Sequence, residues 1–192
     1  MKPARRDTLN TFSIIILIAL LASSCTPRES QVDSKKMADE KNLEKFTSNT
    51  ARKDAKIVTA SVASSLAQIR LADLAIEKTR DQEVKNIALH IKNEHAMLLA
   101  DLTAYAAKRV ITIPSTEERS ARMKIDELKN ESAEFNKKWC DEVLTRYKDS
   151  IKNLETAATE AHDADLREWS GTTLPRLRRN LDLVSACYNR LN

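Results

Sequence analysis

VKNIALHIKNEHAMLLADLTAY, residues 84–105, is the clearest structural signal in this chain. Its apolar residues recur at steps of three and four, which is the period of an amphipathic α-helix. On that helix His95 falls at the centre of the apolar stripe and Glu94 falls at its flank. A carboxylate and an imidazole facing a helical core form either a metal site or a buried hydrogen-bonded pair. The apolar positions are Val84, Ile87, Ala88, Ile91, Leu98, Leu102 and Tyr105.

The composition of the 192 residues predicts an all-α protein. Glycine occurs once and proline four times, which are too few turn residues for a many-stranded sheet. The net charge of +4 is small beside 60 charged residues (32 + 28), so it indicates a solvated surface rather than a nucleic-acid-binding face. The length suits one domain with appendages.

The first 24 residues are typical of a signal peptide. Lys2, Arg5 and Arg6 form a basic start, and residues 12–22 form an apolar run that only Ser13 interrupts. Such a run is short for a membrane span and normal for an export signal. We therefore expect residues 1–24 to be removed from the mature protein.

The five residues Leu21–Cys25 resemble a bacterial lipobox, which predicts lipidation of Cys25. The membrane would then be a partner through the N-terminal lipid, on the periplasmic side or at the outer membrane. The alternative is ordinary cleavage near Ser24 with a free Cys25. Residues 25–50 are polar and read as a tether, in which Met37, Leu43 and Phe46 support at most a loose helical lead-in.

Residues 51–192 contain four long amphipathic segments joined by short connections, which predicts an antiparallel four-helix bundle. An extra short helix is expected between the second and third long helices, starting from the capping box of Ser115 and Glu118. Gly171 and Pro175 should kink or interrupt the last helix. The expected helices run over residues 51–79, 81–109, 115–130, 132–161 and 163–191.

Two cysteines have a testable relation to the turn expected at His162 and Asp163. The midpoint of positions 140 and 187 is 163.5, so Cys140 and Cys187 should sit at the same height of a helical hairpin. In an exported protein they could form a disulfide bond. The alternative is a pair of buried free thiols.

The bundle region, from about Lys56 to Leu191, resembles a family of exported ferritin-like bacterial proteins of unknown function, often labelled predicted outer membrane proteins. The resemblance implies inward acids or histidines at positions where this chain has Gln68, Asn136, Tyr147 and Asn180, and Asp-His where it has Glu94 and His95. It rests on Leu66-Ala67-Gln68-Ile69, on Val84-Lys85 through Glu94-His95, on Ile113-Pro114, on Phe135-Asn136 with Trp139, and on Leu174-Pro175-Arg176-Leu177.

Only Glu94 and His95 keep the ligand chemistry of such a site, since amides are poor ligands for iron, manganese or zinc. No Glu-x-x-His pair of the ferritin-like type is present either. We therefore expect no enzyme activity, no cofactor and a polar core layer held by hydrogen bonds. The layer comprises Gln68, Glu94, His95, Asn136, Tyr147 and Asn180.

The sequence thus favours a lipid-anchored cell-envelope protein with a structural or binding role and an unknown protein partner. One alternative is a metal-binding or stress-related module that retains an ion at Glu94 and His95. A second alternative is a docking module that uses an arginine-rich last helix, with a membrane or a protein as its partner. Its cluster consists of Arg176, Arg178, Arg179 and Arg190.

Overall fold

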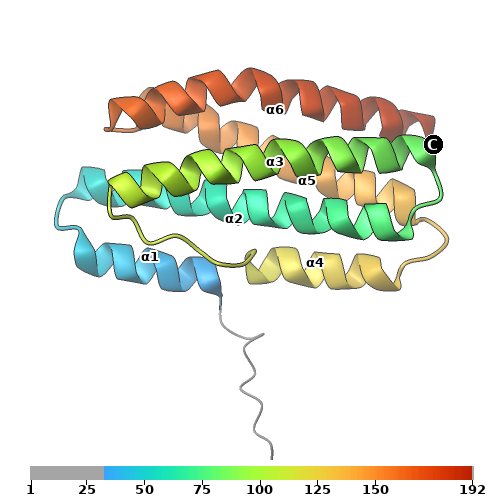
Figure 1. Ribbon diagram of the computed structural model, residues 1–192, viewed down its shortest axis with the longest axis horizontal. Helices are drawn as coiled ribbons and strands as arrows, with labels where there is room; N and C mark the ends of the chain where they lie inside the picture. Colours follow the sequence, from blue (N-terminus) through green and yellow to red (C-terminus); the bar gives the residue numbers. More distant parts are fainter. Residues whose placement is uncertain (1–32, 192) are drawn as a thin grey trace, which may run out of the picture. The chain divides into compact units, whose positions relative to one another are not determined.

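The computed structural model describes residues 33–191, and these residues form helices and no strands. The expected all-α class is therefore confirmed. The expected signal peptide and Cys25 lie outside the described residues. The helices are α1 (Ser34–Lys45), α2 (Asn49–Lys78), α3 (Gln82–Lys108), α4 (Arg119–Asn130), α5 (Phe135–Glu160) and α6 (Ala164–Arg190) (Figure 1).

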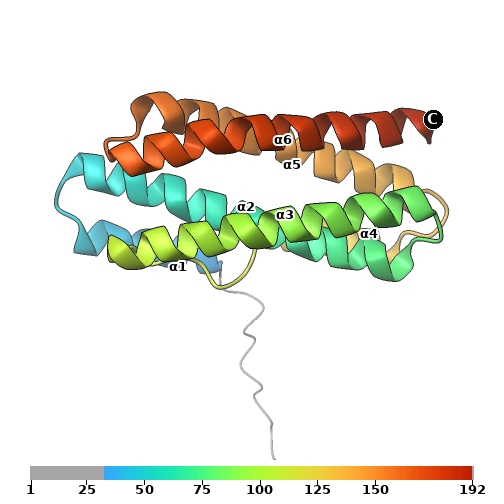
Figure 2. The same cartoon turned by 45° about the horizontal axis from the view of Figure 1, so that its top comes forward.

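Four long helices carry the core and two short ones cover a side of it. Helix α2 packs along α3, α5 packs along α6, and α2 joins the two pairs by packing on α5 (Figure 2). The short helices α1 and α4 follow one another along α2 (Figure 1). The sequence predicted one short helix, and residues 33–191 contain two.

The core is aliphatic, with Trp139 as its largest buried side chain. Trp139 is fully buried, and its indole Nε1 donates a hydrogen bond of 2.8 Å to the Leu71 carbonyl oxygen of α2. A buried indole needs such an acceptor, because an unpaired N–H is costly away from water. This bond links α5 to α2 at the centre of the main apolar cluster.

Part of the expected polar tether is a packed helix. Ala38 and Asn42 of α1 are buried, and Asn42 forms two hydrogen bonds with the backbone of Thr112, one to the N–H and one to the carbonyl oxygen. Asp33 caps α1 by accepting from the N–H groups of Lys35 and Lys36. The sequence did not predict a packed helix in this polar stretch, because α1 is held by a polar contact rather than by an apolar stripe.

The same Asp33 explains why the expected capping box does not form. Its second carboxylate oxygen lies 3.5 Å from the N–H of Arg119, the first residue of α4. Ser115 does not cap α4, and its N–H donates to the Ser34 hydroxyl over 2.7 Å. One carboxylate therefore serves the N-termini of both short helices, at the point where they meet.

Helix α6 continues without interruption through Gly171 and Pro175, contrary to the break allowed by the sequence. Proline has no N–H to donate to the carbonyl group four residues earlier, and its ring crowds that group. In α6 this carbonyl group belongs to Gly171. Gly171 is exposed, so water can solvate that carbonyl. Among residues 33–191, no helix is long and apolar enough to cross a membrane.

Candidate functional site

His95 is the centre of a polar layer inside the helical core. Its side chain is buried, with Nδ1 3.4 Å from the Ser65 hydroxyl of α2 and Nε2 3.3 Å from the Tyr147 hydroxyl of α5. Burial, reinforced by the positive charge of Arg176, lowers the pKa of His95 from 6.5 to about 3. His95 is therefore a neutral imidazole at physiological pH, with one N–H to donate and one nitrogen to accept.

The layer continues from Tyr147 to the opposite side of the bundle. Burial raises the pKa of the Tyr147 hydroxyl and outweighs the opposite effect of the neighbouring Asn180 amide. Asn180 is itself buried on α6, and its Oδ1 lies 2.9 Å from Nε2 of the exposed His90. Hydrogen bonds thus join Ser65, His95 and Tyr147 across α2, α3 and α5, and a separate contact joins Asn180 of α6 to His90 of α3. The buried Nδ2 of Asn180 has no hydrogen-bond partner among the described residues.

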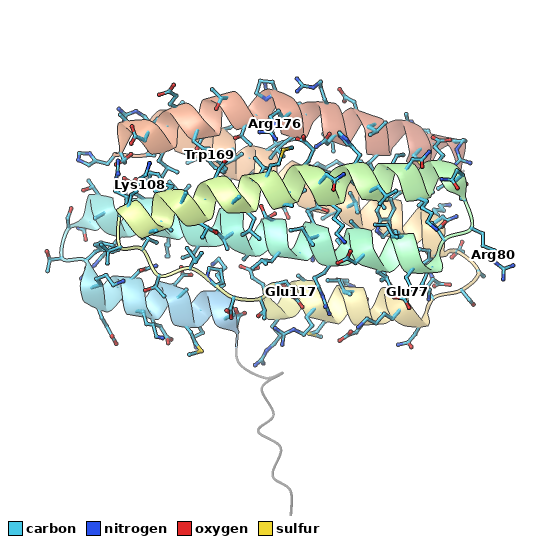
Figure 3. All side chains as sticks on the ribbon, viewed as in Figure 1. Glu77, Arg80, Lys108, Glu117, Trp169 and Arg176 are labelled. Carbon is cyan, nitrogen blue, oxygen red and sulfur yellow. The ribbon has the colours of Figure 1, made fainter. Side chains whose placement is uncertain are left out.

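Glu94 does not join this layer. Its Oε2 accepts a hydrogen bond of 3.1 Å from Nε of Arg176, which lies on α6 (Figure 3). The ion pair leaves 17% of the Glu94 side chain exposed at the contact between α3 and α6. The sequence placed Glu94 correctly at the flank of the stripe but gave no sign of its arginine partner.

Asn136 also lies away from the layer, which corrects the expectation from the sequence. It sits in the first turn of α5, where its Oδ1 accepts a hydrogen bond of 2.8 Å from the Thr79 hydroxyl. Eleven residues separate it from Tyr147, or about 16 Å along a helix. Gln68 is fully buried as expected, but neither atom of its amide has a hydrogen-bond partner among the described residues.

The arginine cluster of the last helix is largely neutralised by acids of the same domain. Besides Arg176, Arg178 pairs with Glu155 at 2.7 Å. Arg190 pairs with Asp81 at 2.8 Å and with Glu83 at 2.7 Å. Ion pairs of this kind are typical of a solvated surface.

Cys140 and Cys187 lie side by side, as their distances from the turn predicted. Both are buried thiols, and their Sγ atoms are 4.0 Å apart. Burial raises the pKa of the Cys140 thiol, and the neighbouring Cys187 adds to this effect. The pair joins α5 to α6 seven residues (187 − 180) from Asn180, the residue of α6 in the His95 layer.

Comparison with known proteins assigns the chain to a family. Residues 35–186 match the model of a domain of unknown function, DUF4142. The chain belongs to this family. The DUF4142 match includes α1, and it bears out the resemblance to a bacterial family of unknown function.

The DUF4142 fold has a counterpart among solved structures. A crystal structure of a DUF305 fragment from Deinococcus radiodurans superimposes with a TM-score of 0.63 at 12% sequence identity. The similarity covers 72% of this chain and 96% of that one, and it concerns the fold alone. None of the curated proteins compared with this chain matches it.

The DUF4142 domain also has polar features near His95 that the sequence did not single out. Ser65 of α2, whose hydroxyl contacts the imidazole, is one of them. Ser64 of α2 and Ser150 of α5 share a hydrogen bond of 2.7 Å. The indole Nε1 of Trp169 is buried without a hydrogen-bond partner in the described part of the chain. Such contacts depend on the rotation and height of the helices, which sequence periodicity does not specify.

Across residues 33–191, no three His, Cys, Asp or Glu side chains come close enough to share a metal ion. The two residues that the sequence retained as ligands have other partners here. The Glu94 carboxylate pairs with Arg176, and both nitrogens of His95 face hydroxyl groups. The arrangement suits a hydrogen-bonded layer that orients the four long helices relative to one another.

Proposed function

We propose that this chain is a lipid-anchored cell-envelope protein whose domain has a structural or binding role without catalysis. In this proposal the domain is a ferritin-like four-helix bundle that carries additional short helices. Export rests on the basic and apolar pattern of residues 1–24, and the anchor rests on the lipobox-like residues that precede Cys25. Of the positions that carry ligands in the resembling family, His95, Tyr147 and Asn180 belong to a polar layer in this chain, whereas Glu94 and Asn136 have partners elsewhere.

One observation carries the non-catalytic assignment. His95 is held neutral in the core between two hydroxyl groups, while the carboxylate next to it in sequence is paired with Arg176 on another helix. A metal site built on Glu94 and His95 would have to give up that ion pair and the hydrogen bond at the imidazole nitrogen that binds the metal. The favoured role of the layer is therefore to fix the relative positions of α2, α3, α5 and α6.

The metal content of the protein tests this assignment. The protein is purified without chelator and analysed by elemental mass spectrometry, beside His95→Gln and the surface control His162→Gln. We expect less than about one tenth of an equivalent of transition metal in all three. Near-stoichiometric metal that is lost only in His95→Gln would refute the non-catalytic layer and support the metal-binding alternative.

The lipid anchor is tested separately, because it can fail while the layer assignment stands. We expect the protein expressed in a Gram-negative bacterium to fractionate with membranes and to carry acyl chains at Cys25 by mass spectrometry. Cys25→Ser should release it to the soluble fraction or leave its signal peptide uncleaved. Soluble, acyl-free protein with an intact Cys25 would contradict the anchor.

A further inference from the structure

A small cavity lies beside His95, between α2, α5 and α6. It offers about 20 Å³ of space to the centre of a water molecule. Its walls include the imidazole of His95, the hydroxyl-bearing residues Ser65 and Thr173, and the indole of Trp169. The remaining walls include Leu98, Leu154 and Leu177, so the hydrogen-bonding groups occupy only part of the lining. A cavity that stays dry lacks such groups altogether.

Trp169 supplies a hydrogen-bond donor at this cavity. Trp169 lies on α6 (Figure 3) and lines the cavity together with His95. Its Nε1 is buried and has no hydrogen-bond acceptor among residues 33–191. An unpaired buried N–H is unfavourable by about 1–3 kcal/mol, so native structures rarely leave one unsatisfied. Trp139 shows the usual solution, with its Nε1 bonded to the Leu71 carbonyl oxygen.

Thr173 lies one turn after Trp169 and lines the same cavity. It is only 2% exposed. The indole N–H of Trp169 and the hydroxyl groups of Thr173 and Ser65 thus surround one water-sized space. A buried water typically makes two to four hydrogen bonds and needs about 10–15 Å³ of such space.

We propose that this cavity binds one water molecule. The water accepts a hydrogen bond from Trp169 Nε1–H and bonds to the hydroxyl groups of Thr173 and Ser65. It extends the polar layer from His95 to α6 and satisfies the indole without any movement of the helices. This inference does not depend on the lipid anchor or on the absence of a metal ion.

The structure also indicates how this water exchanges with solvent. A larger cavity of about 320 Å³ lies on the α4 side of α2 and α5 and is lined by Glu118, Arg146 and Asp149. Both cavities are lined by Ser64 and Ser150, whose side chains share a hydrogen bond. We therefore expect the water to leave past this pair of serines when their hydrogen bond opens.

Nuclear magnetic resonance of the two tryptophans tests the proposal directly. In the ¹⁵N-labelled protein, the indole N–H proton of Trp169 should show a cross-relaxation peak with water, of the sign given by a long-lived bound water. The indole proton of Trp139 should show none, which makes it an internal control. Absence of the peak at Trp169 would overturn the proposal.

Two matched variants distinguish bound water from exchange through a nearby hydroxyl group. Thr173→Val removes the hydroxyl and keeps the space, so the water peak of Trp169 should persist. Thr173→Ile fills the space with an extra methylene group, so the peak should disappear while the Trp139 resonance stays in place. A peak that persists in Thr173→Val excludes exchange through the Thr173 hydroxyl, and a peak retained in Thr173→Ile would refute a bound water.

A crystal structure of the unaltered protein gives an answer even where a variant fails to fold. At a resolution better than about 1.8 Å, we expect an electron-density peak about 3 Å from Nε1 of Trp169. A different rotamer of Trp169 that places its N–H on a protein acceptor would contradict the proposal.

Discussion

At the scale of single residues, His95 illustrates how surroundings set chemical behaviour. A histidine in water gains a proton near pH 6.5, but this imidazole lies in a core where a positive charge has no solvation. The nearby Arg176 acts in the same direction. His95 is therefore a neutral hydrogen-bonding group whose protonation is coupled to unfolding.

The pH dependence of stability should reveal this coupling. The pKa of His95 is about 3 in the folded state and 6.5 in the unfolded state, so the unfolded state binds more protons between these pH values. The free energy of unfolding should thus fall as the pH drops from about 6.5 towards 3, by up to ~4 kcal/mol. Urea unfolding at pH 7, 5.5 and 4 measures this fall in the free energy of unfolding.

The variant His95→Gln removes this contribution and should show a shallower loss of stability over the same pH range. His162→Gln is the matched control, because His162 is exposed in the turn before α6 and should leave the slope unchanged. Equal slopes for the unaltered protein and His95→Gln would show that His95 is not the group responsible.

The inward direction of His95, Tyr147 and Asn180 could be predicted, because periodicity places each residue on a face of its own helix. The partners could not be predicted, since they depend on the height at which separate helices meet. Asn136 faces inward at the wrong height, and the ion pair between Glu94 and Arg176 joins helices that are far apart in sequence.

At the scale of helices, distant residues decide where several elements begin and end. Lys78 of α2 donates to the carbonyl groups of Leu128 and Lys129 in the last turn of α4, and to that of Glu131, which follows the helix. Asp54 of α2 accepts from the N–H groups of His162 and Asp163 in the turn between α5 and α6. The end of α4 at Asn130 and the turn after α5 lie where the sequence predicted them. The tertiary contacts that hold these ends could not be predicted, because they join residues far apart in sequence.

Replacing Asp54 should weaken the turn between α5 and α6. The carboxylate accepts two backbone hydrogen bonds, of 2.9 and 2.8 Å, at a site only 6% exposed. We expect Asp54→Ala to lower the free energy of unfolding by about 2–4 kcal/mol. Asp54→Asn keeps one acceptor oxygen and should lower the free energy of unfolding by about half as much as Asp54→Ala. Equal losses for both variants in chemical denaturation would contradict this division.

The end of α3 contains an unfavourable backbone conformation. Val110 has a φ of 57°, while Ile111 and Val110 donate to the carbonyl groups of Ala106 and Ala107. This is a Schellman motif, in which glycine is the preferred residue at the left-handed position. A β-branched residue there is strained by about 1–2 kcal/mol.

We expect Val110→Gly to raise the free energy of unfolding by about 1 kcal/mol, despite the greater freedom that glycine has in the unfolded chain. Val110 is 66% exposed, so little packing is lost. Val110→Ala keeps the Cβ atom and should leave stability nearly unchanged. Equal gains from glycine and alanine in thermal unfolding would show that the backbone strain is not relieved.

At the scale of the whole molecule, two helical hairpins carry the described domain. The pair α2–α3 and the pair α5–α6 each pack closely, and the polar layer and the Glu94–Arg176 ion pair connect them. The all-helical class followed from composition. The sequence did not predict α1 as a packed helix, because α1 lacks the apolar stripe that marked the other helices.

A disulfide bond between Cys140 and Cys187 should close the α5–α6 hairpin in an oxidising compartment. Each thiol loses one proton and one electron to the disulfide of an oxidoreductase, and the two sulfurs join. The bridge should stabilise the protein by about 4 kcal/mol in the chain-entropy model. Alkylation after denaturation without reductant should leave both cysteines unmodified, and reductant should restore two reactive thiols.

Expression in a reducing cytosol is the control, since both cysteines should then be alkylated. Substituting both with alanine should remove the stability difference between oxidised and reduced protein. Two alkylated cysteines in protein purified from an oxidising compartment would contradict the bridge.

The carboxylate of Asp33 fastens α1 and α4 where they meet, partway along α2 rather than at its tip (Figure 1). A single side chain therefore supplies hydrogen-bond acceptors to the first turns of two helices that are far apart in sequence. Loss of that one carboxylate would remove N-terminal hydrogen bonds from both short helices at once.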